Sequence, residues 1–155
     1  MSASLAGLRR ARADDLSALV ALQRAAYEPM GEISGGTPKP LRVDYAEVLA
    51  DLEVWLLGGD PLEAALILEY QPDAVLVWSV AVAPTGESRG VGRALLSYAE
   101  TRARAKGLNL MRLYTNTKFE RNRAIYRQFG YDEVRFERIG DDEPPFVIVH
   151  MEKPL

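Results

Sequence analysis

The apolar positions of this chain change their spacing along the sequence, and each spacing predicts a different kind of element. In the first third they recur every three or four residues, as on one face of an α-helix. One predicted helix begins at Asp14, whose side chain can cap it, and carries a stripe of Leu16, Leu19, Val20, Gln23 and Tyr27. A shorter helix is predicted from Asp44 to Leu52, because Asp44 and Glu47 resemble a capping box. Glycine and proline in residues 29–40 predict a loop between the two helices.

Beyond this loop, short apolar runs bounded by turn residues predict strands. They lie at residues 54–57, 62–70, 74–82, 110–115, 131–139 and 146–151. The run at 74–82 is apolar on both faces, so we expect it in the middle of a sheet. Helical spacing returns at residues 90–106 and 122–129.

This order of elements predicts an α/β fold in which helices flank a mixed, mostly antiparallel sheet. We expect one domain over residues 1–155. The strand ending at Val82 and the strand containing Leu113 are expected to run parallel and to diverge at their ends.

Composition narrows the classes of protein to consider. The chain is 48% hydrophobic and 26% charged, which is typical of a globular domain, and it contains no cysteine. Disulfides, thiolate metal sites and a cysteine nucleophile are therefore excluded. A net charge of -3 argues against a general nucleic-acid binder. Neither a signal peptide nor a membrane-spanning apolar run is predicted, and a cytoplasmic location is expected.

Residues 80–96 combine the end of an apolar strand with a loop that enters a helix. Unpaired backbone N–H groups and the positive end of the helix dipole suit a phosphate or pyrophosphate. Gly90 and Gly92 let an anion approach the backbone, and Arg89 and Arg93 add positive charge. Taken alone, the loop fits equally well a glycine-rich turn into an ordinary amphipathic helix. It is not a P-loop, because no Gly-Lys-Ser/Thr follows.

A second stretch, residues 114–131, contains Thr115-Asn116, then Asn122 and Tyr126 four residues apart on one helical face, then Gly130-Tyr131. It resembles the second signature of the GNAT family of N-acetyltransferases. The first stretch resembles that family's pyrophosphate loop, which follows a Val-x-Pro sequence. The two motifs stand in the family's order and spacing, and the resemblance covers the chain from Leu62 onward.

The resemblance implies the fold of that family, acetyl-CoA as co-substrate, and direct attack of an amine acceptor on the thioester. It implies neither a metal nor a nucleic-acid or membrane partner, and it leaves a homodimer open. Tyr126 would be the acid that protonates the leaving thiolate. The cofactor would be held by the strand residues Val80 and Val82, by the loop residues Ser88, Arg89, Gly90, Val91, Gly92 and Arg93, and by Asn122.

The chain departs from the family pattern at two places. Glu87 stands where relatives have Gln or Arg, and Trp78 and Ser79 stand where many have a glutamate as general base. A CoA-binding regulatory module without turnover is therefore an alternative to an enzyme, and a nucleotide-binding protein is disfavoured by the missing Walker lysine. Other groups considered for the base, none of them chosen, are His150, Glu28, Glu32 and Glu69.

Overall fold

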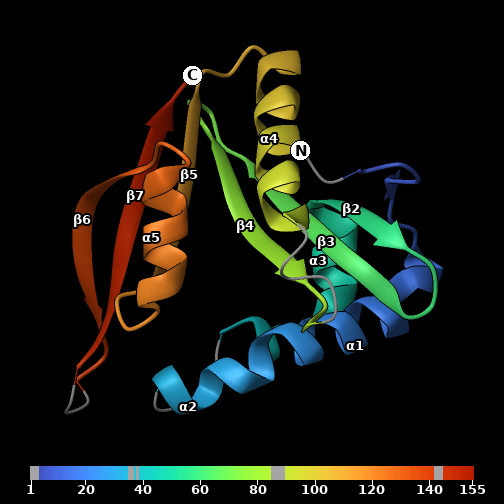
Figure 1. Cartoon of the computed structure of the whole chain (residues 1–155), viewed down its shortest axis with the longest axis horizontal. Coiled ribbons are helices and arrows are strands. Elements are labelled where there is room, and N and C mark those ends of the chain that lie inside the picture. The colour runs from blue at the N-terminus through green and yellow to red at the C-terminus, as the bar shows by residue number, and fades with distance from the viewer. Residues whose placement is uncertain (1–3, 35–36, 38, 85–89, 142–144) are drawn as a thin grey trace.

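A computed structural model describes residues 4–34, 37, 39–84, 90–141 and 145–155. Its centre is a seven-stranded sheet in the order β1-β2-β3-β4-β5-β7-β6 (Figure 1). The strands are β1 Arg9–Arg10, β2 Glu53–Gly58, β3 Leu62–Tyr70, β4 Val75–Val82, β5 Leu110–Asn116, β6 Asp132–Ile139 and β7 Phe146–Pro154. The helices are α1 Leu16–Tyr27, α2 Gly31–Ser34, α3 Tyr45–Asp51, α4 Val91–Ala105 and α5 Glu120–Gln128. The predicted fold class, a mixed and mostly antiparallel sheet flanked by helices, is confirmed.

The only parallel contact among the described strands is the one between β4 and β5. It extends over just two residue pairs, Val75 with Met111 and Leu76 with Arg112. Beyond them β5 pairs with β7, while β4 pairs with β3 alone, so the sheet opens into a V (Figure 1). The predicted parallel and diverging pair of strands is therefore confirmed.

The sheet buries a separate apolar layer on each face. Because side chains alternate along a strand, Leu66 of β3 packs under α4, whereas its neighbour Ile67 packs under α1 and α3. Both residues are fully buried. The strand β4 is fourth of the seven, as its apolar sequence predicted. Helices α4 and α5 cover one face, and α1 with α3 covers the other.

Two local predictions need correction, and one strand was missed. A 3-10 turn, η1 Ala13–Asp15, precedes α1, so Asp15 rather than Asp14 holds the N-cap position. The predicted loop at 29–40 contains η2 Glu28–Met30, α2 and η3 Lys39–Leu41. Strand β1 was not predicted. Asp44 does cap α3, by accepting from the N–H of Ala46 at 2.9 Å.

A partly buried ion pair holds α4 against β2. The Glu53 carboxylate accepts from Arg102 at 2.7 and 3.1 Å and from the Trp55 indole at 2.7 Å. Burial alone would raise the pKa of Glu53, but the hydrogen bonds from Arg102 and Trp55 outweigh it and lower the pKa to about 2. Among the described residues, no helix is long and apolar enough to cross a membrane.

Candidate active site

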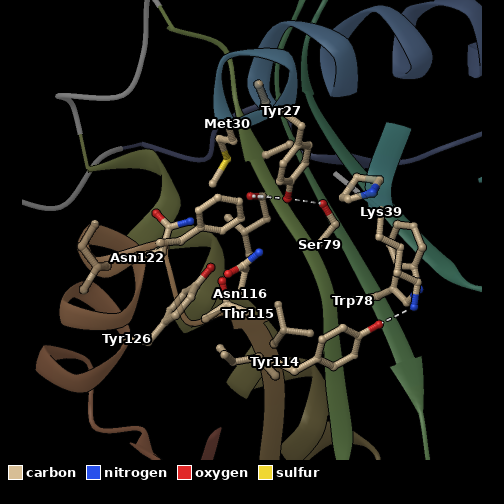
Figure 2. A pocket seen from close by; sticks show the side chains of 18 of the residues that line it. Tyr27, Met30, Lys39, Trp78, Ser79, Tyr114, Thr115, Asn116, Asn122 and Tyr126 are labelled. Carbon is tan, nitrogen blue, oxygen red and sulfur yellow. Dashed lines mark hydrogen bonds between the residues drawn. The ribbon is translucent and has the colours of Figure 1, made fainter. Parts of the chain in front are cut away.

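The V between β4 and β5 holds a pocket of about 860 Å³. Its walls come from β4, β5, the first turn of α4 and the inner face of α5. The end of α1, together with η2 and η3, closes one side (Figure 2). Strands β6 and β7 contribute the other side. Segments that are far apart in the sequence therefore meet in one cavity large enough for a cofactor arm and a second substrate.

Val80 and Val82 present backbone N–H and C=O groups to this pocket, and the Val80 carbonyl accepts from the Tyr27 hydroxyl at 3.4 Å. The N–H of Ala83 donates to the Glu63 carbonyl of the neighbouring chain segment at 2.8 Å. Hydrogen-bonded and non-bonded pairs alternate along an antiparallel ladder, so the N–H and C=O groups of Val80 and Val82 point away from β3. They face the side from which β5 has diverged. An extended chain could pair with them as an added strand would.

The first turn of α4 borders the same opening. Gly90 caps the helix with φ +76°, a left-handed conformation that favours glycine, and it lines the pocket together with Gly92 and Arg93. A Cβ on Gly92 would lie 3.7 Å from Val82 and 3.9 Å from Val80. The helix therefore runs close beside the free edge of β4.

The remaining residues predicted to hold the cofactor at this loop do not all face the pocket in the way that Gly90 and Gly92 do. The Val91 side chain is buried in the core under α4, so only its backbone is available to a ligand. Arg93 donates to the Gln128 side chain of α5 at 3.2 Å, which ties the two helices together beside the pocket. Ser88 and Arg89 lie outside the described residues, as does Glu87.

Tyr126 and Asn122 project from successive turns of α5 into the pocket (Figure 2). The Tyr126 ring packs edge-on against Tyr131, with ring centroids 6.2 Å apart. Burial raises the pKa of Tyr126, so its hydroxyl stays protonated at neutral pH and can act as a donor. No hydrogen bond holds that hydroxyl in the described part of the chain.

Sequence reasoning missed a buried hydrogen-bond network that begins at Ser79. The Ser79 hydroxyl lies 2.9 Å from the hydroxyl of Tyr27 and accepts from Gln23 at 3.3 Å. Gln23 also donates to Tyr45 at 2.8 Å. Figure 2 draws the hydrogen bond between Ser79 and Tyr27. Burial raises the pKa of Tyr27, which therefore remains a neutral hydroxyl. The one sequence feature that could have indicated this network is the polar residue Gln23 within an otherwise apolar helical stripe.

The position beside Ser79 is shaped by a β-bulge. Val77 pairs with Leu68 and Ser79 pairs with Ile67, so Trp78 is the extra residue on β4. The bulge directs the Trp78 ring into the pocket wall, where it meets Tyr45 edge-on with ring centroids 6.2 Å apart. The family's strand glutamate thus has no counterpart here; a hydroxyl and an indole occupy its place.

Asn116, at the end of β5, is a second residue that sequence reasoning did not select. Its side-chain oxygen accepts from the N–H of Lys118 at 2.9 Å. Asn116 lines the pocket, and its side-chain nitrogen is buried and has no partner among the described residues. A buried amide donor without a partner costs about 1–3 kcal/mol. A ligand that accepts its hydrogen bond would recover that energy.

Of the groups considered as general base, His150 is the one whose described side chain lines the pocket. Its Nε2 lies 2.8 Å from the carboxylate of Glu137. Glu28 and Glu69 lie outside the pocket lining, and the side chain of Glu32 is outside the described residues. Within the described ranges, no group of three His, Asp or Glu side chains could hold a metal ion.

Comparison with known proteins finds a family model and a curated relative that match this chain. A family model described as the acetyltransferase (GNAT) family matches residues 18–131, more than half of the chain. A curated relative, the mycothiol acetyltransferase of Beutenbergia cavernae, is 32% identical over 123 residues, which are 76% of this chain and 41% of that protein. The chain therefore spans about two fifths of the length of this relative.

Two solved structures share the fold. The PaiA N-acetyltransferase of Thermoplasma acidophilum, in complex with coenzyme A, has a TM-score of 0.72 at 18% identity, covering 96% of this chain and 98% of its own. A GNAT family acetyltransferase of Elizabethkingia anophelis, with acetyl-CoA bound, has a TM-score of 0.67 at 16% identity, covering 96% and 97%. At these identities the likeness concerns the fold.

Proposed function

The chain belongs to the GNAT family of acetyltransferases, and we propose that it transfers the acetyl group of acetyl-CoA to a primary amine. The observation that carries the proposal is the free edge of β4, which faces a pocket where β5 has diverged. A CoA-binding regulatory module would need only the cofactor groove, which is the part of the pocket between the edge of β4 and the start of α4. The pocket continues past that groove to Trp78, Tyr114 and His150, which gives an acceptor a place to bind.

In this proposal the pantetheine arm pairs with the backbone of Val80 and Val82. The pyrophosphate lies at the start of α4, where Gly90, Gly92 and the N–H of Val91 offer an open backbone and a positive dipole. Ser88, Arg89 and Arg93 add to this contact, and Asn122 supports the cofactor from α5. The buried nitrogen of Asn116 donates to the same ligand, which gives the orphan donor a partner.

The reaction is direct displacement at the thioester carbonyl. The amine nitrogen forms a bond to the carbonyl carbon, the carbon–sulfur bond breaks, and the amine releases a proton to solvent. Tyr126 donates its proton to the departing sulfur and regains one from solvent, because burial keeps the phenol neutral and its hydroxyl faces the pocket. Backbone N–H groups on the β4 edge stabilise the negative charge that develops on the carbonyl oxygen.

Titration calorimetry with acetyl-CoA and with ATP, followed by thiol release on a panel of amines, tests the proposal. We expect binding of acetyl-CoA in preference to ATP, and thiol release that depends on both enzyme and amine. Binding without any amine-dependent release would leave only a CoA-binding module. The cytoplasmic location, the homodimer and the single domain stay predictions.

A further inference from the structure

The acceptor end of the pocket is bordered by two cations from one short turn. Lys39 and Arg42 both line the pocket, and the N–H of Arg42 donates to the carbonyl of Lys39 at 2.9 Å. Arg42 directly follows η3, and its bond to Lys39 closes a turn of the 3-10 type, in which side chains three residues apart lie on the same side. Both side chains are exposed, at the rim of the pocket rather than in its depth.

No acidic side chain neutralises this pair within the described part of the chain. Glu137 is the acidic residue among the pocket-lining residues, and it is already engaged by His150 at 2.8 Å and by Arg135 at 3.6 Å. Lys39 donates instead to the hydroxyl of Tyr114. The rim is therefore locally positive, although the chain as a whole carries a charge of -3.

Aromatic side chains line the space next to these cations. Tyr114 lies beneath Lys39, whose nitrogen is 5.1 Å from the centre of the ring, and the Trp78 indole forms the adjoining wall (Figure 2). Tyr114 also packs against His150, with ring centroids 5.7 Å apart. A flat or apolar body fits between such walls, and a planar anion fits the two cations at the rim.

We propose that the acceptor is an amine that carries a carboxylate on an aromatic or apolar body. This inference rests on the proposed function. The amine points inward to the thioester between β4 and β5, and the carboxylate remains at the rim with Lys39 and Arg42. A polyamine would bring a second positive charge to the same rim, where the two cations repel it.

A matched series of acceptors tests the inference at saturating acetyl-CoA. The series shares a 2-phenylethylamine body and differs only at the para position, which bears a carboxylate, a carboxamide or an aminomethyl group. We expect kcat/KM to be about tenfold or more higher for the carboxylate than for the carboxamide, and lowest for the diamine. Higher ionic strength should lower kcat/KM for the carboxylate only.

Charge-reversal variants locate the effect. Lys39→Glu and Arg42→Glu should each lower kcat/KM for the carboxylate about tenfold while leaving the carboxamide within about twofold. Arg24→Glu is the control, since Arg24 is an exposed cation on α1 outside the pocket lining.

Each outcome of this experiment has one meaning. Equal or better turnover of the carboxamide or the diamine overturns the inference and leaves the proposed function intact. Equal losses for all three acceptors in the Lys39 and Arg42 variants also overturn it. Absence of acetyl transfer to every amine overturns the proposed function, and the inference with it.

Discussion

Replacing Tyr126 by phenylalanine removes one hydroxyl and keeps the ring that packs against Tyr131. The hydroxyl faces the pocket and has no hydrogen-bond partner among the described residues. Deleting it therefore breaks no described internal bond, and folding should be unaffected. Turnover should suffer, because the leaving sulfur loses its proton donor.

The expected size of the effect follows from acid catalysis. A positioned acid contributes about a hundredfold to ten-thousandfold, so kcat should fall by that factor while the affinity for acetyl-CoA stays within about twofold. This loss is equivalent to about 3–5 kcal/mol of barrier. Because burial raises the pKa of Tyr126 above its ordinary value of 10.0, its protonated form should support turnover through neutral and mildly alkaline pH.

Tyr131→Phe is a matched control. The hydroxyl of Tyr131 is also buried and also lacks a partner among the described residues, but Tyr131 does not line the pocket. Removing it should leave kcat unchanged and leave the stability equal or slightly higher, since an unsatisfied polar group is lost.

The assay is steady-state thiol release with a productive amine, combined with titration of acetyl-CoA. If Tyr126→Phe is folded and retains wild-type kcat, the assignment of the acid is refuted. If it binds acetyl-CoA weakly but turns over normally, Tyr126 only holds the cofactor.

Three further changes probe the groove and its support. Gly92→Val should weaken acetyl-CoA binding about tenfold because its branches would project beside Val82, whereas Gly92→Ala should bind normally; equal calorimetric affinities would contradict this. Asn116→Asp keeps the acceptor for the Lys118 N–H but removes the buried donor, so acetyl-CoA affinity should fall about tenfold, and unchanged affinity would count against the contact. Glu53→Gln should cost on the order of 3 kcal/mol of unfolding free energy near pH 7, because the pKa of Glu53 is about 2 in the fold. The ionised Glu53 carboxylate stabilises the fold above the pKa it has in the unfolded chain, and this contribution fades as pH falls from about 5 towards 2. A difference in unfolding free energy between wild type and Glu53→Gln that does not change with pH, measured by urea unfolding, would refute this assignment.

The sheet and most helices could be predicted because their patterns are local. An apolar run at 74–82, bounded by turn residues, indicates a buried strand wherever it occurs, and the strand patterns together with the helix from Gly90 predicted the parallel, diverging pair. Strand β1 gives no such pattern. It is two arginines that pair with Trp55 and Leu56 through the backbone, so no side-chain periodicity marks it.

The candidate site was predictable only where a motif names its residues. Asn122, Tyr126, Gly90 and Gly92 are all brought to one pocket. The contact between Lys39 and Tyr114 joins residues 75 positions apart, and no local pattern encodes such a separation. The same holds for Ser79, whose partners Tyr27 and Gln23 lie on another element.

The measurement closest to the central claim is transfer of label from trideuteroacetyl-CoA to an amine, followed by mass spectrometry. We predict one labelled acetyl group on the amine nitrogen for each free thiol released, with both rates reduced together in Tyr126→Phe. Free thiol without labelled amine would indicate hydrolysis of the thioester instead. Neither product, with every amine of the panel and with the folded wild-type chain, would contradict the assignment of acetyl transfer to this pocket.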